Sequence, residues 1–157
     1  MLTLLRTNSE HPDFIELVKY LDQELKIRDG EDHDFYHQFN KIDAIKYAIV
    51  AYLDEKPVGS GAIKVYDDQT MEVKRMYVPP EFRGQGIASA VLKALEDWTL
   101  ELGYHNCILE TGINQPEAIA MYKKLGYTMI PNYGQYEGVE NSVCFEKQLS
   151  ESGFSGF

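Results

Sequence analysis

The segment 71–95, MEVKRMYVPPEFRGQGIASAVLKAL, predicts a strand, a tight loop and a helix, and the rest of the chain can be placed around it. β-Branched and aromatic residues favour extended backbone up to Val78, and the two prolines that follow end the strand because proline donates no ladder hydrogen bond. Apolar residues recur at helical spacing over 88–95. In the loop, Gly84 and Gly86 let the backbone turn and come close to a ligand, while the helix start presents unpaired N–H groups. The segment therefore predicts an anion site, most naturally one for a phosphate.

The pattern Arg-x-x-Gly-x-Ala at 83–88 resembles the acetyl-coenzyme A loop of the GNAT superfamily of N-acetyltransferases. A second stretch at 118–127, AIAMYKKLGY, resembles the second signature of that family, and the two stretches lie in the expected order. The resemblance is close over 46–131 and covers the N-terminal third only in the order of its elements. The competing interpretation is that Gly84 and Gly86 merely close a turn between a strand and a helix.

The resemblance implies a GNAT-like acyl-CoA N-acyltransferase fold, which is an α/β fold with a single central mixed sheet flanked by helices. It also implies acetyl-CoA as the cofactor and coenzyme A as its product. The sequence predicts strands near 2–6, 47–53, 58–66, 71–78, 106–109, 127–130 and 142–148, and helices near 12–27, 34–41, 87–102 and 116–125. Within one of these strands, Gly59 and Gly61 indicate either close approach of the backbone to another element or a twist of the strand, rather than phosphate binding.

The length of 157 residues fits one domain, placed at 1–149, and the tail 150–157 has no periodicity and is expected to be mobile. Cys107 and Cys144 lie far apart with no C-x-x-C spacing, which predicts reduced thiols and a cytoplasmic location. The sequence shows no leader-like segment and no apolar run of membrane-spanning length, so we expect a soluble protein without a membrane partner.

The charge is strongly negative, with 25 acidic residues against 15 basic ones and a formal net charge of −10. Such a charge repels nucleic acid, so we expect no nucleic-acid partner. It is either ordinary surface charge or a field that attracts cationic ligands. Because coenzyme A is itself anionic, the basic residues near the glycine loop would have to supply local positive charge. These residues are Lys74, Arg75, Arg83 and Lys93. The choice between a monomer and a homodimer is left open.

The cofactor site is predicted by the resemblance. Backbone amides of 84–89 and the Arg83 side chain would bind the pyrophosphate. The strands predicted near 71–78 and 106–109 would splay apart. The free backbone around Met76 would then bind the pantetheine arm, and the Met76 amide would polarise the thioester oxygen. The family commonly has an asparagine where this chain has Gln115, and since Asn114 lies one residue earlier, either amide could hold the pantetheine. The predicted cofactor-binding residues are Met76, Tyr77, Val78, Arg83, Gly84, Gln85, Gly86, Ile87, Ala88, Ser89, Asn114, Gln115 and Tyr122.

Two catalytic residues are also predicted by the resemblance. Glu72 matches a strand glutamate that takes a proton from the amine in several family members, usually through water. The alternative is an ion pair with Lys74 or Arg75, and strict alternation would place Glu72, Lys74 and Met76 on one face of the strand. Tyr122 matches a tyrosine whose phenol, with an ordinary pKa of about 10, could donate a proton to the departing thiolate. Its alternative role is that of a core tyrosine.

The acyl acceptor is expected at the first two predicted helices, at the end of the 71–78 strand and at the loop 131–138. The candidate acceptor-binding residues are Arg28, His33, His37, Arg75, Tyr133 and Tyr136, each of which can also be a plain surface or packing residue. His33 and His37 are four residues apart, as in some metal sites, but no third ligand with motif spacing follows and no metal is predicted.

Together these assignments predict an acetyl-CoA-dependent N-acetyltransferase that acts directly on a primary amine of a small molecule or amino-acid-like substrate. Two alternatives are a protein N-terminal or lysine acetyltransferase and a non-catalytic sensor that binds acyl-CoA. A sensor needs neither an acid nor a base, so the presence of Glu72 and Tyr122 favours an enzyme. The aromatic residues Tyr133 and Tyr136 favour a closed pocket over an open groove for a protein.

Overall fold

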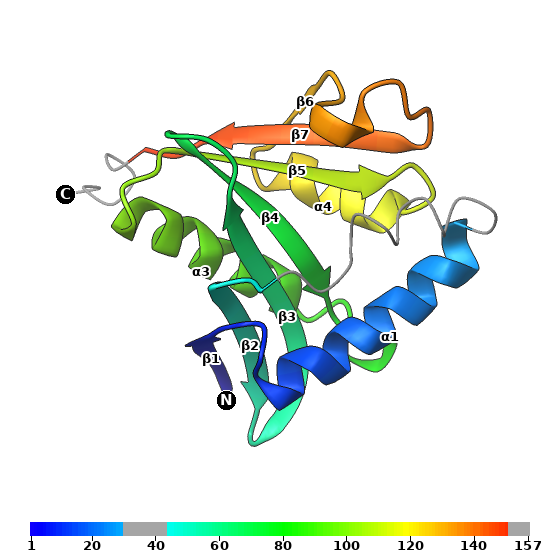
Figure 1. Cartoon of the computed structure of the whole chain (residues 1–157). Coiled ribbons are helices and arrows are strands. Elements are labelled where there is room, and N and C mark those ends of the chain that lie inside the picture. Colours follow the sequence, from blue (N-terminus) through cyan, green and yellow to red (C-terminus); the bar gives the residue numbers. More distant parts are fainter. Residues whose placement is uncertain (30–43, 151–157) are drawn as a thin grey trace. The chain divides into compact units, whose positions relative to one another are not determined.

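The computed structural model describes residues 1–29 and 44–150 of the chain. Its strands form one seven-stranded mixed sheet with the order β1-β2-β3-β4-β5-β7-β6 (Figure 1). In chain order the elements are β1 (Leu2–Thr7), α1 (Pro12–Asp29), β2 (Tyr47–Leu53), β3 (Lys56–Val65), β4 (Thr70–Tyr77), the 3-10 helix η2 (Pro80–Phe82), α3 (Ile87–Glu101), β5 (Asn106–Gly112), α4 (Pro116–Lys124), β6 (Thr128–Ile130), the 3-10 helix η3 (Gly134–Tyr136) and β7 (Ser142–Gln148). β4 pairs in parallel with β5, and β2 pairs antiparallel with both β1 and β3. The predicted fold class is therefore confirmed.

The described residues divide into two compact units. The first unit comprises residues 1–29, 44–64 and 73–95, and the second unit comprises 65–72 and 96–150. β4 and α3 each contribute residues to both units.

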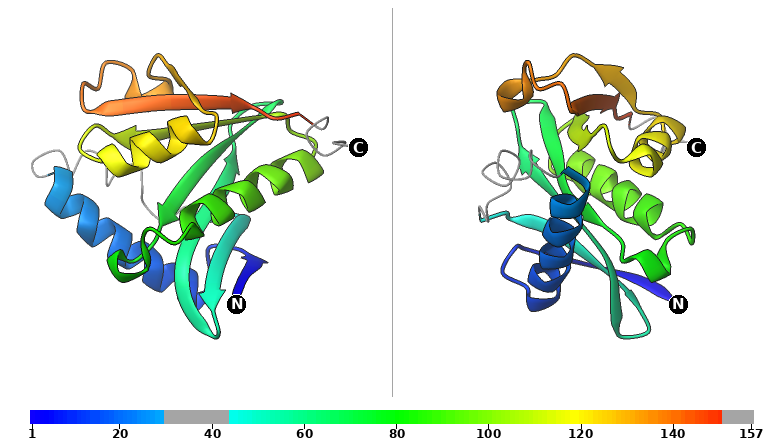
Figure 2. Two further views of the ribbon diagram at one scale, coloured as in Figure 1. Left: turned by 180° about the vertical axis from the view of Figure 1, so that it is seen from behind. Right: turned by 90° about the vertical axis from the view of Figure 1, so that its right-hand side faces the viewer.

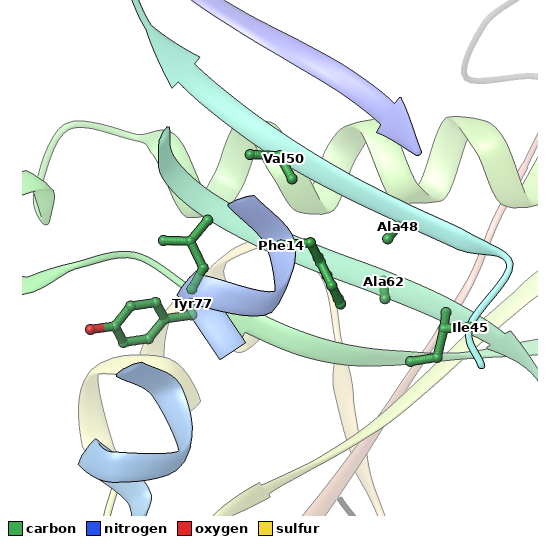
Figure 3. Packing of buried hydrophobic residues seen from close by; sticks show 7 residues of the cluster. Phe14, Ile45, Ala48, Val50, Ala62 and Tyr77 are labelled. Atoms are coloured by element: carbon green, nitrogen blue, oxygen red, sulfur yellow. The ribbon is translucent and has the colours of Figure 1, made fainter. Parts of the chain in front are cut away.

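The core of the first unit lies between α1 and the strands of its sheet. Phe14 and Leu17 lie on one face of α1, and both are only 3 % exposed. They pack with Ala48 and Val50 of β2 and with further residues of the same cluster, as Figure 3 shows for Phe14. The full cluster consists of Phe14, Leu17, Ile45, Ala48, Val50, Ala62 and Tyr77. The apolar stripe that predicted this helix therefore packs in the interior.

β3 approaches α3 so closely that two of its positions require glycine. A Cβ atom on Gly61 would lie 2.7 Å from Val91 Cγ1 and 2.8 Å from Leu95 Cδ1, both of them atoms of buried α3 side chains. A Cβ atom on Gly59 would lie 2.9 Å from Ile87 Cγ2. The predicted role of these glycines, close approach of the backbone, is confirmed.

In the second unit, β5 pairs with two strands. Thr70–Glu72 of β4 pair in parallel with Asn106–Ile108, and the whole of β5 pairs antiparallel with β7. α4 lies along one face of β5 and β7 (Figures 1 and 2), where the Tyr122 and Phe145 rings have a centroid separation of 6.2 Å. The sheet of this unit therefore has one face covered by α4.

A buried carboxylate joins α3, β7 and the turn between α4 and β6 in the second unit. Glu96, on α3, is only 4 % exposed. The Tyr127 hydroxyl donates a hydrogen bond of 2.8 Å to its Oε2, and Lys147 Nζ of β7 donates one of 3.0 Å to its Oε1. A buried charge is tolerated only when such partners satisfy it, so the three side chains depend on one another.

The predicted elements are confirmed with shifts of a few residues at their ends. The helix predicted at 34–41 and the tail after residue 150 lie outside the described residues. One local feature of β4 was not foreseen: Arg75 has a left-handed backbone with φ of +59°, and its carbonyl accepts a buried hydrogen bond of 2.9 Å from Ser60 Oγ. Such a residue interrupts the regular pleat, so the strict alternation expected from Glu72 to Met76 does not hold across it.

Cys107 and Cys144 are both buried and free, as predicted. Within the two described ranges, no helix is both long enough and apolar enough to cross a membrane.

Candidate active site

The predicted anion loop lies in the first unit, immediately before α3. Gly84 and Gly86 have φ of +80° and +78°, a conformation that favours glycine, and a Cβ atom on either would meet no described atom within 4 Å. The Gly86 carbonyl accepts the first helical hydrogen bond, from the Ala90 amide at 3.0 Å. Ile87, 3 % exposed, anchors the first turn of α3 in the core. The loop is therefore open in front of a helix start whose first amides have no intrahelical acceptor.

Arg83, at the start of this loop, makes three contacts within the first unit. Its Nε donates a hydrogen bond of 2.8 Å to the Val78 carbonyl, and its Nη2 lies 2.7 Å from Glu24 Oε1 on α1. Its guanidinium also lies over the Tyr77 ring, 5.7 Å from the centroid. These contacts hold the loop between the end of β4 and α1. Contact of Arg83 with a pyrophosphate stays a prediction.

The remaining predicted cofactor residues of the first unit lie at the end of β4 and the start of α3. Tyr77 and Val78 are each 8 % exposed, and burial is the main cause that raises the pKa of the Tyr77 phenol. Met76 lies close enough to β3 for its Sδ to be 2.7 Å from a Cβ placed on Gly61. Ala88 and Ser89 are half-buried, whereas Gln85 is exposed. The backbone role predicted for Met76 stays a prediction.

Tyr122, the predicted proton donor, lies on α4 in the second unit and is 5 % exposed. Its ring makes an edge contact with Tyr127, with a centroid separation of 5.8 Å, and a tilted contact with Phe145. Burial, and to a lesser degree the nearby Glu110 carboxylate, raises the pKa of the phenol. Among the residues that the structure describes, none forms a hydrogen bond with the Tyr122 hydroxyl. The phenol therefore stays protonated at neutral pH and can donate to a ligand, although the same ring packing is also what a core tyrosine would show.

The predicted base and one predicted acceptor residue lie together in the second unit. The Tyr133 hydroxyl donates a hydrogen bond of 2.7 Å to Glu72 Oε2. The Tyr133 ring has edge contacts with Tyr66, at a centroid separation of 5.3 Å, and with Tyr136, at 5.7 Å. The predicted alternative role of Glu72 was an ion pair with Lys74 or Arg75, so a tyrosine partner was not expected. We call Tyr66, Tyr133 and Tyr136 the tyrosine cluster.

A second carboxylate lies on the same face of the sheet as Glu72. Glu72 pairs with Ile108, and Glu110 follows two residues later on β5, so the side chains of both acids point to that face. Ser142 Oγ donates a hydrogen bond of 2.7 Å to Glu110 Oε2. Tyr136 is 3 % exposed, and its pKa is raised by burial first and then by the charges of Glu110 and Glu72. This face of the second unit therefore combines acidic and aromatic groups.

Comparison with known proteins identifies the family of the chain. The family model described as the acetyltransferase (GNAT) family matches residues 14–127. The chain belongs to the GNAT acetyltransferase family. It is 36 % identical over 102 residues to the IAA acetyltransferase of Azospirillum brasilense, a match that covers 64 % of this chain and 67 % of that one. It is 39 % identical over 84 residues to human N-acetyltransferase 8, where the match covers 50 % of this chain but only 37 % of the human protein.

Solved GNAT structures agree with this assignment. A Klebsiella pneumoniae protein assigned as an acyl-CoA N-acyltransferase superposes with a TM-score of 0.79 at 28 % identity, covering 96 % of this chain and 99 % of that one. A GNAT acetyltransferase from Elizabethkingia anophelis, solved with acetyl-CoA bound, has the same fold, with a TM-score of 0.67 at 16 % identity over 94 % of this chain and 98 % of that one. As a GNAT acetyltransferase, the protein is an acetyl-CoA-dependent acyltransferase.

For several predicted residues of this GNAT acetyltransferase, a role in the site stays a prediction. His33 and His37 lie outside the described residues, and Arg28 belongs to α1 but its side chain is not described. Asn114 is exposed and Gln115 is half-buried at the start of α4, so the choice between them stays open. Arg75 is buried, with 9 % of its surface exposed.

Sequence reasoning missed Glu110 and Tyr66. The sequence gave only a weak signal for Glu110. Ile108, two residues earlier in the same strand and therefore on the same face, is apolar, so the strand pattern did not indicate a polar site there. No local pattern links Tyr66 to Tyr133. Only the pairing of β4 with β5 and the fold of the loop after β6 bring these groups to one face.

Proposed function

We propose that this GNAT acetyltransferase transfers the acetyl group of acetyl-CoA directly to a primary amine of a small molecule or amino-acid-like substrate. The observation that carries the proposal is the hydrogen bond between Tyr133 and Glu72. It joins the aromatic loop, where a small acceptor was expected, to the strand carboxylate that matches the family's base. An alkylammonium has a pKa of about 10, so only a small fraction of the amine is nucleophilic at neutral pH unless a carboxylate base or a desolvating pocket shifts the balance, and Glu72 would be that base.

The residues of this chain would divide the reaction among them. Acetyl-CoA supplies the thioester, and the amides of 84–89 would bind its phosphates at the start of α3. Glu72 would first accept one proton of the ammonium, directly or through water, and the neutral amine would then attack the carbonyl carbon. The nitrogen of the tetrahedral adduct would lose its second proton to solvent. The Met76 amide would stabilise the developing oxyanion. When the carbon–sulfur bond breaks, Tyr122 would give its proton to the thiolate, and solvent would return one to the phenol.

Acceptor class is tested by measuring coenzyme A release with a panel of amines: phenylethylamine, 1,4-diaminobutane, glycine, L-lysine and a peptide with a free N-terminus and one lysine. We expect turnover with at least one of the small amines to exceed turnover with the peptide. If only the peptide is acetylated, the small-molecule assignment is wrong and the enzyme acts on proteins.

Tyr122→Phe tests the assigned proton donor, because it keeps the ring contacts with Tyr127 and Phe145 but removes the hydroxyl. We expect the single-turnover rate to fall by about 10²-fold, the size of a general-acid contribution, with acetyl-CoA affinity unchanged. The raised pKa of Tyr122 keeps the phenol protonated, so the difference should persist across roughly pH 6 to 9. A Tyr122→Phe enzyme as fast as wild type throughout this range would remove Tyr122 from the mechanism.

A cytoplasmic location also stays a proposal. The two buried free thiols fit a reducing compartment, in which disulfides do not persist.

A further inference from the structure

We propose that Tyr133 is a positioning residue for Glu72, so that the loop from 131 to 138 controls the orientation of the base. This inference rests on the proposed function, in which Glu72 takes the proton of the amine. The distance of 2.7 Å between the Tyr133 hydroxyl and Glu72 Oε2 is that of a direct hydrogen bond from a hydroxyl to a carboxyl oxygen. Such a bond fixes the rotation of the carboxylate about its side chain.

Tyr133 is itself held from several sides. It lies immediately before η3, and its carbonyl accepts a hydrogen bond of 2.9 Å from the Tyr136 amide. Its ring is packed edge-on against Tyr66 and Tyr136, in the geometry that aromatic pairs prefer. Asn132 Nδ2 donates a hydrogen bond of 2.9 Å to the Val139 carbonyl, which closes the loop around the cluster. A phenol held in this way can hold a flexible glutamate in turn.

The hydroxyl of Tyr133 stays protonated, and therefore a donor, at neutral pH. Burial is the largest cause that raises the pKa of this phenol, and the charge of Glu72 adds to it. The neutral phenol therefore does not take up the proton that Glu72 receives from the amine. Its contribution is orientation, so it acts through Glu72 and not on the substrate.

The orientation of Glu72 matters because the ammonium proton must be within its reach before the amine can attack. A misplacement of about 1 Å can slow a reaction by as much as 10²-fold. Loss of a purely structural hydrogen bond would instead lower the stability of the fold and leave the rate of the folded enzyme unchanged. These two roles are separable by experiment.

The test is a double-mutant cycle in single-turnover rates, with saturating acetyl-CoA and the panel amine that wild type acetylates fastest. The variants are Tyr133→Phe, Glu72→Gln and the double variant. We expect Tyr133→Phe to lower the rate about 10-fold while acetyl-CoA affinity is unchanged, within the range that misplacement produces. In the Glu72→Gln background, where no base remains to be positioned, Tyr133→Phe should have no further effect.

Tyr52→Phe is the matched control, since it removes a hydroxyl that also donates to a carboxylate, Asp13 Oδ2 at 2.6 Å, outside the candidate active site. We expect it to react at the wild-type rate. If Tyr133→Phe does not fold, Glu72→Asp replaces it, because the shorter side chain withdraws the carboxylate from Tyr133 and should slow the reaction to a similar degree.

The outcomes separate this inference from the proposed function. A wild-type rate in Glu72→Gln would show that Glu72 is not the base, and both would be wrong. A slow Glu72→Gln enzyme with a wild-type rate in Tyr133→Phe would overturn the positioning role alone. Equal losses from Tyr133→Phe in both backgrounds would also overturn it, because Tyr133 would then act independently of Glu72.

Discussion

The first unit contains two pairs of glycines with the same spacing and opposite surroundings. Gly59 and Gly61 in β3 are packed so tightly that a Cβ atom would lie within 3 Å of α3 side chains. Gly84 and Gly86, in the loop before α3, would meet no described atom within 4 Å but have positive φ angles. The first pair is required by what is already packed there, whereas the second is required by the path of the backbone and by access for a ligand. A Gly-x-Gly pattern therefore predicts a site only when its surroundings are empty.

The largest expected effect comes from placing a charge in the open pair. Gly86→Glu puts a carboxylate at the start of α3, where phosphates are predicted to bind, and adds a Cβ at a φ of +78°. We expect the Kd for acetyl-CoA, measured by calorimetry, to rise at least about 100-fold, or ~2.7 kcal/mol. Gly103→Glu is the control, because Gly103 has φ of +92° and equally open surroundings beyond the other end of α3. Unchanged affinity in a folded Gly86→Glu protein would mean that this loop does not bind the cofactor.

The packed pair should respond in the opposite way. Gly61→Ala places a methyl group against three side chains at once, and overpacking of this kind costs about 1–3 kcal/mol. We expect urea denaturation to show that loss of stability, and the melting temperature to fall by roughly 2–4 °C per kcal/mol. Acetyl-CoA affinity of the folded protein should be unchanged. A variant of wild-type stability would show that Met76, Val91 and Leu95 can move aside without penalty.

Gly59→Ala connects the packed pair of glycines with the open pair. Its Cβ would press on Ile87, which lies in α3 and also within the pattern at 83–88. The close contact is with Ile87 Cγ2 at 2.9 Å, and the other neighbours lie at 3.5 Å. We expect a loss of about 1 kcal/mol in unfolding free energy, at the low end of overpacking effects. Because Ile87 is the first residue of α3, acetyl-CoA binding should weaken slightly as well. A loss of stability as large as that of Gly61→Ala would argue against a difference between the two positions.

The smallest expected effect concerns Arg83, which leads into the open pair. Glu24→Gln removes the charge that holds the Arg83 guanidinium, whose side chain is 37 % exposed. Partly exposed ion pairs contribute at most about 1 kcal/mol, so the change in stability should be small. If Arg83 binds pyrophosphate as predicted, release from Glu24 should tighten acetyl-CoA binding by about twofold to fivefold. Weaker binding by Glu24→Gln would mean instead that Glu24 aims Arg83 at the cofactor.

The fold and the backbone of the glycine loop could be predicted because their signals are local. Apolar periodicity, prolines and glycines within 71–95 were enough to place a strand, a loop and a helix start. The side-chain pairs of the second unit could not be foreseen in the same way. Tyr133 and Glu72 are 61 residues apart, and Lys147 and Glu96 are 51 apart, so only the tertiary fold of this unit brings them together.

The left-handed backbone of Arg75 was missed for a different reason. Positive φ angles are predicted from glycine or asparagine, and an arginine gives no such signal. Its conformation depends on tertiary contacts such as the hydrogen bond from Ser60 Oγ. Strand periodicity alone could therefore not assign the residues beyond it to a face of the sheet.

The two buried cysteines of the second unit make its local opening measurable through the rate of thiol labelling. Cys107 and Cys144 are both 0 % exposed, and burial raises the pKa of each thiol to about 11. In the closed protein they are out of reach of an alkylating reagent and almost entirely in the unreactive thiol form at neutral pH. A reagent added to the native enzyme therefore reacts only during transient openings of the strands that carry them, and the labelling rate counts those openings. Acetyl-CoA or an amine that binds only the closed form would lower the rate of cysteine labelling. The labelling rate therefore reports ligand binding without any need to detect turnover.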